Sequence, residues 1–208
     1  MSSKSLGDCA SVLLDTGVVI EAIQPKTSTD RQKLVHDILK HLSKTKTKNG
    51  LVRRFYISDI SLSEIANIST VNNVITKLHP ILRVSNLSVV PFDTEIAVWL
   101  SNNFADLLNQ KVLNRIARES GYPSEKLQMA REWINRDMMI VATGKHYNVD
   151  LALTTEKYIS AGKTTFWGLS AKAGLFCAPT YKEFFMESHG DDFFPEFNLG
   201  NLKPPSLT

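Results

Sequence analysis

The chain has 208 residues, of which 43% are hydrophobic and 22% are charged. This composition indicates a compact globular protein with one full core, and it excludes a collagen-like or low-complexity chain. Twenty-four Lys and Arg against 21 Asp and Glu give a net charge of +3, far below the excess of a dedicated nucleic-acid packaging protein.

Apolar runs and helical periodicities alternate along the chain. Val12 to Leu14 form a short apolar run that is typical of a strand buried on both faces, which indicates a parallel sheet. Further strands are predicted at 55–58, 87–90, 151–153 and 175–177. Helices are predicted at 18–23, 30–43, 61–68, 71–84 with an interruption at Pro80, 93–107 and 125–146.

This alternation predicts an α/β fold with three layers, α/β/α, around an open, mainly parallel five-stranded sheet. We expect a single domain over residues 1–188, with helical insertions around 25–52 and 105–129. Residues 189–208 are expected to form an extended C-terminal tail.

The cysteines and the apolar runs suggest where the protein works. Cys9 and Cys177 lie far apart without a CxxC partner, which excludes a zinc ribbon and a disulfide scaffold. No stretch reads as a signal peptide, and no uncharged apolar run is long enough to cross a bilayer. We therefore expect a cytoplasmic protein with no membrane partner.

Common nucleotide and hydrolase motifs are missing from the sequence. Gly162, Lys163 and Thr164 resemble the end of a P-loop, but the Gly required five residues earlier is Lys157. GxGxxG, HExxH and GxSxG are also absent from the sequence. Function must therefore be sought in other polar residues.

Two acids follow predicted strands. Asp15 ends the first strand, and Glu156 follows the strand at 151–153. Ligands of open α/β sheets bind outside the carboxyl ends of the strands, which favours a functional role. Helix capping is the alternative for both: Asp15 as an N-cap, and Glu156 as an acid in a first helical turn behind a capping Thr.

Asp137 lies on the apolar face of its predicted helix, beside Met138 and Val141. A carboxylate in apolar surroundings is disfavoured unless it is paired, protonated or bound to a cation. Arg131 or Arg136 could pair with it in a purely structural ion pair.

Glu64 also lies near apolar residues, Ile65 and Ile68. Ser61 and Glu64 fit the S-x-x-E pattern of a capping box, which is the structural alternative for this acid.

Together the four acids predict one cluster at one end of the sheet. Like charges repel one another unless a divalent cation neutralises them. Oxygen ligands without Cys or His favour Mg²⁺ or Mn²⁺ over zinc. Because Mg²⁺ also accepts phosphate oxygens from a substrate, phosphodiester hydrolysis is the predicted chemistry.

Five segments resemble PIN domains in their order along residues 11 to about 178. They are VLLDT at 12–16, YISDISLSEI at 56–65, VPFDTE at 90–95, DMMIVA at 137–142 and LALTTE at 151–156. The resemblance implies a five-stranded parallel sheet flanked by helices and a metal-dependent nuclease, usually acting on RNA, with VapC-like toxins as the most populous relatives.

The resemblance also implies roles for single residues. Asp15, Glu64 and Asp137 match the three acids most characteristic of the family's metal site. Glu156 stands where the family commonly has Asp, and Gly17 stands where many relatives have Asn. We expect Asp15 and Asp137 to hold the ion directly, while Glu64 and Glu156 bind a metal or orient its water. Asp93 and Glu95 are assigned to helix capping.

We therefore expect a Mg²⁺- or Mn²⁺-dependent endoribonuclease that hydrolyses RNA and acts as the toxin of a toxin–antitoxin pair. Its expected protein partners are an antitoxin or a second copy of the chain. The alternative is a non-catalytic RNA-binding or regulatory PIN-like module. The stretches 38–58 and 71–92 are basic and contain no acid, which favours contact with phosphates. The expected substrate-binding residues are Thr16, Thr154, Thr155, Arg53, Arg54, Lys145 and Lys157.

Overall fold

The structure is a computed structural model that describes residues 8–24, 29–66, 68–82, 84–119, 123–156 and 165–180. Its strands are β1 (Ser11–Leu14), β2 (Arg54–Ser58), β3 (Leu87–Val90), β4 (Leu151–Thr154) and β5 (Cys177–Pro179). Its α-helices are α1 (Thr16–Ile23), α2 (Asp30–Lys44), α3 (Asp59–Ile65), α4 (Val71–Leu78), α5 (Thr94–Asn103), α6 (Ala105–Leu108), α7 (Gln110–Glu119), α8 (Leu127–His146) and α9 (Phe166–Ala173).

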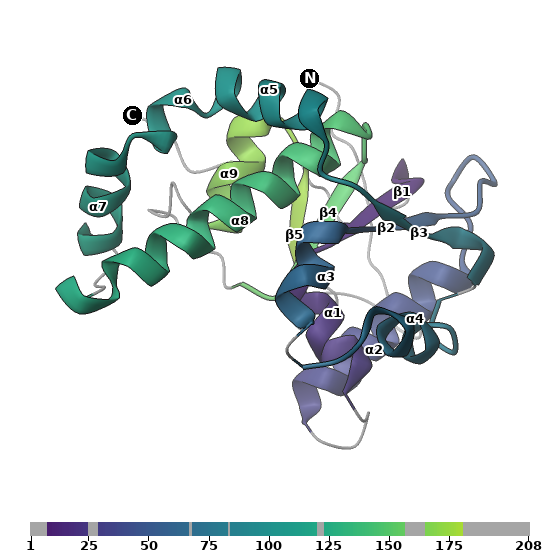
Figure 1. The fold of residues 1–208 in the computed structure, drawn as a ribbon. Coiled ribbons are helices and arrows are strands. Elements are labelled where there is room, and N and C mark those ends of the chain that lie inside the picture. The colour runs from purple at the N-terminus through teal and green to yellow at the C-terminus, as the bar shows by residue number, and fades with distance from the viewer. Residues whose placement is uncertain are drawn as a thin grey trace.

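The strands form one five-stranded sheet in the order β3-β2-β1-β4-β5. Every neighbouring pair is parallel, so the predicted α/β fold is confirmed and the sheet is parallel throughout. Helices cover both faces of the sheet (Figure 1). Because all five strands run the same way, their carboxyl ends lie at one edge of the sheet, called the carboxyl edge below, and their amino ends lie at the opposite, amino edge.

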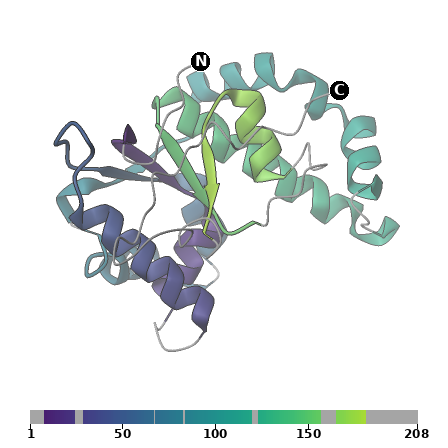
Figure 2. The ribbon, with the colours of Figure 1, turned by 180° about the vertical axis from the view of Figure 1, so that it is seen from behind.

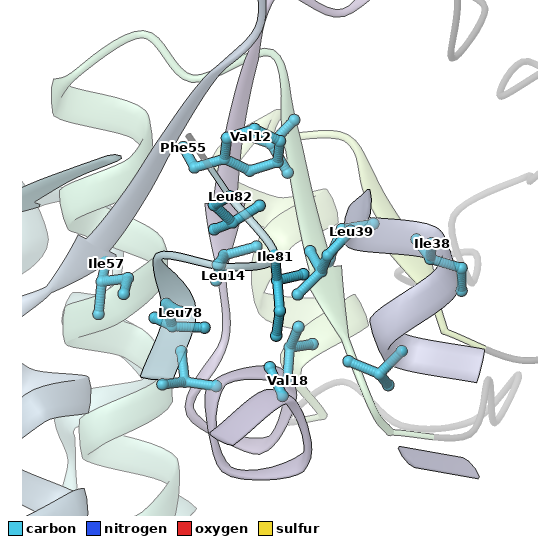
Figure 3. Packing of buried hydrophobic residues seen from close by; sticks show 14 of the residues in the cluster. Val12, Leu14, Val18, Ile38, Leu39, Phe55, Ile57, Leu78, Ile81 and Leu82 are labelled. Carbon is cyan, nitrogen blue, oxygen red and sulfur yellow. The ribbon is translucent and has the colours of Figure 1, made fainter. Parts of the chain in front are cut away.

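The central strand β1 is buried on both faces, as its apolar sequence predicts. Val12 and Leu14 belong to a core cluster formed with α1, α2 and α4, while Leu13 belongs to a second cluster formed with α5, α8 and α9. Figure 3 shows the first cluster, in which Val12 and Leu14 lie near Phe55 of β2 and Leu39 of α2. The two clusters hold the ends of β1 and β4 in fixed positions between two helical layers.

Several helices differ from their predicted ranges. The helix predicted at 93–107 is divided at Phe104 into α5 and α6, and the one predicted at 71–84 ends at Leu78. α6 and α7 lie in the expected helical insertion around 105–129, whereas α9 was not predicted. In α9, Phe166, Trp167 and Leu169 are all buried, so the segment has no polar face to mark it as a helix.

The long helix α8 joins the sheet to a helical extension. Its carboxyl-terminal half packs on the sheet, while α6, α7 and its amino-terminal half extend away from the strands, as both views show (Figures 1 and 2). No described helix is long and apolar enough to span a bilayer. The predicted tail at 189–208 lies outside the described residues.

Asp150 fastens β1 to β4 at the amino edge. Its Oδ2 accepts hydrogen bonds from the backbone N–H of Ala10 at 2.8 Å and of Ser11 at 3.0 Å, and from the Ser11 hydroxyl at 2.9 Å. Because a carboxylate that accepts several N–H and O–H groups forms strong hydrogen bonds, this contact helps to fix the register of the two central strands.

Candidate active site

Asp15 lies at the carboxyl end of β1, between β1 and β4. Its backbone N–H donates to the Leu153 carbonyl at 3.0 Å, which continues the β1–β4 pairing by one residue. The side chain is buried, and its Oδ2 accepts a 2.8 Å hydrogen bond from the Thr154 hydroxyl. Asp15 is the N-cap residue of α1, but its side chain makes no capping hydrogen bond, so capping does not explain the carboxylate.

Glu64 lies in the last turn of α3, and the predicted capping box is wrong. α3 begins two residues before the predicted start, and its N-cap is Ser58, whose hydroxyl accepts a hydrogen bond from the Ile60 N–H at 3.2 Å. Ser61 is buried inside the helix, so it cannot pair with Glu64 across a helix start. Glu64 Oε2 instead accepts a hydrogen bond from the Thr16 hydroxyl.

Asp137 lies on α8, and neither predicted arginine pairs with it. Arg131 donates to Asn114 Oδ1 at 2.7 Å, and Arg136 Nη1 lies 3.6 Å from Glu64 Oε1. Among the described residues, no hydrogen bond or ion pair engages the Asp137 carboxylate. The structural ion pair with Arg131 or Arg136, which was the alternative explanation for Asp137, is therefore not formed.

Glu156 follows β4 by two residues. Its backbone N–H donates to the Thr154 hydroxyl at 3.1 Å, and its Oε2 accepts the N–H of Phe166 at 2.8 Å. Phe166 is the first residue of α9, so the carboxylate satisfies an otherwise free donor at a helix N-terminus. Glu156 thus accepts a hydrogen bond at the start of α9, 10 residues further along the chain.

The charges of neighbouring acids act on Asp15 and on Asp137. Burial raises the pKa of Asp15 to about 7; the Thr154 hydrogen bond opposes this rise, while the charges of Glu156 and Glu64 add to it. Burial also raises the pKa of Asp137 well above its ordinary value, and the charges of Asp15, Glu156 and Glu64 raise it further. The pKa of Glu156 is raised by burial and lowered by the Phe166 hydrogen bond. Asp15 and Asp137 are therefore close enough to the other acids at the carboxyl edge for those charges to raise their pKa.

The chemistry of this set fits a hard divalent cation. It offers carboxylate oxygens, together with Thr154 in contact with Asp15, and burial makes uncompensated negative charge costly there. As the side chains are placed, no three His, Cys, Asp or Glu residues in the described part of the chain converge closely enough to form a metal-binding group. Glu64 and Glu156 are instead bonded to Thr16 and Phe166.

The predicted threonines lie at the carboxyl edge. Thr154 contacts Asp15, Thr16 contacts Glu64, and Thr155 follows Thr154 with its side chain buried. A Cβ at Gly17 would come within 2.1 Å of Thr155 Oγ1, so Thr155 fills the space that a side chain at Gly17 would need.

The prediction that Arg53 contacts substrate is wrong, because Arg53 is a buried structural residue. Only 4% of its surface is exposed. Its Nε donates to the Cys9 carbonyl at 3.0 Å, and its Nη1 donates to the Thr45 carbonyl at 2.8 Å. Burial lowers the pKa of Arg53, and backbone carbonyls accept its donors in place of water.

Of the remaining predicted cations, Arg54 and Lys145 lie away from the acids. Arg54 begins β2 and is in register with Ser11, so it lies at the amino edge, a strand length of about 13 Å from the carboxyl edge. Lys145 lies about 12 Å along α8 from Asp137, and its Nζ is 3.7 Å from the position that a Cβ of Gly174 would take. Lys157 lies outside the described residues.

Arg31 is a cation at the site that sequence reasoning missed. Its Nη2 donates to the Thr155 carbonyl at 2.8 Å, across 124 residues of sequence. No local pattern signals this contact, because Arg31 reads as an ordinary polar residue in the first turn of α2.

Asp93 and Glu95 lie at the start of α5, as predicted. Asp93 Oδ1 accepts the Ile96 N–H at 3.0 Å, which confirms its assignment as a helix cap. Glu95 is in the first helical turn, and its Oε2 lies 4.0 Å from His146 Nε2.

Comparison with known proteins gives structural similarities but no match by sequence. No protein-family model matches the chain, and no curated protein matches it. The structure is similar to a chain in the crystal structure of VapBC2 from Rickettsia felis bound to a DNA fragment from their promoter. The two share 15% sequence identity over 81% of this chain and 98% of that chain, with a TM-score of 0.45.

Proposed function

We propose that the protein is a Mg²⁺- or Mn²⁺-dependent nuclease of the PIN type that hydrolyses RNA phosphodiester bonds. The observation that carries this proposal is the cluster of four acids at the carboxyl edge of a parallel sheet. Burial and mutual repulsion raise the pKa of Asp15 and of Asp137, which is the expected state of acids that lack a counter-charge.

Asp15 and Asp137 would hold the ion, and Glu64 and Glu156 would complete the site. When bound, the ion lowers the pKa of a water molecule and offsets charge on the scissile phosphate. Glu156 is suited to accept the proton of the attacking water, because its raised pKa brings it closer to neutral pH.

Three hydrogen bonds position the carboxylates without removing their charge. The hydroxyl of Thr154 fixes Asp15 Oδ2, that of Thr16 fixes Glu64 Oε2, and the Phe166 N–H fixes Glu156 Oε2. Such preorganised groups need little rearrangement when the ligand binds. We assign Thr16 and Thr154 as positioning residues on this basis.

Two finer parts of the proposal rest on the five ordered segments that resemble PIN domains. These are RNA as the substrate, and a role as the toxin of a toxin–antitoxin pair with a protein antitoxin. Induced expression in a bacterial host tests the second: wild type arrests growth, whereas the Asp15→Asn/Asp137→Asn variant does not. Normal growth with well-expressed wild type contradicts the toxin role.

A non-catalytic RNA-binding module is the second candidate. The specific observation in its favour is that Glu64 is already engaged by Thr16 and by Arg136 instead of converging with the other acids. This candidate predicts RNA binding that neither needs a divalent cation nor leads to cleavage.

Cleavage of single-stranded and structured RNA by the purified full chain separates the two candidates. We expect cleavage with Mn²⁺ or Mg²⁺, none with EDTA, and none by Asp15→Asn/Asp137→Asn. The matched control is Asp30→Asn/Asp93→Asn, which changes the charge equally at exposed acids outside the cluster and retains activity. RNA binding without cleavage in any metal contradicts the nuclease, and cleavage that persists in the site variant shows that the acids are not responsible.

A further inference from the structure

Two arginines approach the acid cluster from opposite faces of the sheet. Arg31 lies in the first turn of α2, a helix that packs on the face formed with α1 and α4. Arg136 lies on α8, a helix that packs on the other face. The sheet therefore brings one guanidinium to each side of the same edge.

Arg31 is held next to the end of β4. Besides its bond to the Thr155 carbonyl, its Nε lies 3.5 Å from Glu21 Oε1. Thr155 immediately precedes Glu156, so this arginine stands within one residue of an acid of the cluster. The Arg31 side chain is 44% exposed, which leaves part of the guanidinium open to a ligand.

Arg136 is held on the other side, next to α3. Its Nη1 lies 3.6 Å from Glu64 Oε1, and its neighbour in sequence is Asp137. The Arg136 side chain is also 44% exposed, whereas that of Glu64 is only 17% exposed. The ion pair therefore anchors the arginine at the rim of the cluster while other donors of the guanidinium stay accessible.

A phosphodiester substrate needs cations beside such a cluster. The acids repel a polyanion, and a divalent ion offsets this charge only at the reacting phosphate. The neighbouring phosphates remain uncompensated. Guanidinium groups suit them, because their planar donor pattern matches phosphate oxygens and they stay charged at every working pH.

We propose that Arg31 and Arg136 bind backbone phosphates of single-stranded RNA on the two sides of the scissile bond. The strand then crosses the carboxyl edge from the α2 side to the α8 side. This assignment rests on the proposed function and replaces Arg53, Arg54 and Lys145 as the cations that contact substrate at this site.

Binding of fluorescein-labelled single-stranded RNA, measured by fluorescence anisotropy, tests the assignment. The full-length Asp15→Asn/Asp137→Asn variant serves as background, because the RNA stays intact in it. Into this background we place Arg31→Gln, Arg136→Gln, or both, and follow the association constant as NaCl is raised. Each lost phosphate contact should make the slope of log K against log[NaCl] shallower by about 0.7, and the double change by about 1.4.

Two controls separate phosphate binding from structural effects. Arg54→Gln and Lys145→Gln remove the same charge at the amino edge and should leave the slope unchanged. Arg31→Lys and Arg136→Lys keep the charge and should restore most of the slope. A purely structural role for Arg136, such as holding Glu64, would change the melting temperature but not the salt dependence of binding.

The outcomes distinguish this assignment from the proposed function. Equal slopes in the arginine variants and the background, or equal losses in the amino-edge controls, overturn the assignment even when wild type cleaves RNA. Arginine-dependent slopes together with no cleavage by wild type in any metal support the assignment and contradict the nuclease.

Discussion

Replacing Asp15 by Asn should stabilise the metal-free protein at neutral and higher pH. The pKa of Asp15 is about 7 in the folded protein against an ordinary value of 3.8, a difference of about 3 units, or about 4 kcal/mol. Between these two pH values the folded state holds a proton that the unfolded state has released, so the free energy of unfolding falls as pH rises. Asn has no charge to bury and can still accept the Thr154 hydroxyl.

Urea unfolding in EDTA at a series of pH values measures this effect. At pH 4 and below the two proteins should differ little, and above pH 7 Asp15→Asn should be more stable by up to about 4 kcal/mol. Asp93→Asn, at an exposed helix cap, is the control and should show no such gain. A variant that is less stable than wild type at pH 8, or a difference that does not change with pH, would refute the reasoning.

Three further substitutions test contacts outside the acid cluster. Asp150→Ala removes the acceptor of three hydrogen bonds and should lower the free energy of unfolding, measured in urea, by about 3 kcal/mol. The control Asp30→Ala should lower it by less than about 1 kcal/mol. Similar losses in the two variants would contradict the role of Asp150. Gly17→Ala should lower the free energy of unfolding by about 1–3 kcal/mol, because the new Cβ clashes with Thr155 Oγ1. The double variant with Thr155→Ala should recover this stability. Additive losses in the double variant would exclude the clash. Arg53→Ala should lower the melting temperature without changing RNA affinity of the folded protein, and a selective loss of affinity would restore it as a substrate contact.

The sheet could be predicted because it depends on local sequence patterns, and the same kind of pattern singles out the four acids. The buried strands read as short apolar runs; Asp15 directly follows β1, and Glu156 follows β4 by two residues. Asp137 is conspicuous because it shares a helix face with Val141 at i+4, which is fully buried. Such patterns can be read from a single sequence because they depend on the spacing of apolar residues along the chain.

The cations could not be predicted because their roles depend on long-range contacts. Arg53 and Arg54 are adjacent in a basic stretch, yet their environments differ. Arg53 is buried before the start of β2 and donates to the carbonyls of Cys9 and Thr45, whereas Arg54, the first residue of β2, is exposed at the amino edge. Arg31 reaches the site only through the carbonyl of Thr155. Charge in the sequence therefore gave no guide to which arginines lie beside the acids.

The capping alternatives for the acids were also decided by contacts between distant segments. Glu64 fits a capping box in sequence, but α3 starts at the end of β2 and moves the N-cap to Ser58. Thr16 of α1 then meets Glu64 from another element. The capping-box pattern at Ser61 and Glu64 is thus present in the sequence but does not cap the helix, because β2 fixes the helix start at an earlier residue.

Binding of Mn²⁺ to the full chain, followed by electron paramagnetic resonance, tests most directly whether the four acids share a cation. We predict a saturable Mn²⁺ site in wild type that weakens as pH falls below 7, because protons then compete for Asp15. The site should be lost in Asp15→Asn/Asp137→Asn and retained in Asp30→Asn/Asp93→Asn. The absence of saturable binding in wild type, or equal binding in the Asp15→Asn/Asp137→Asn variant, would contradict a metal site at the carboxyl edge.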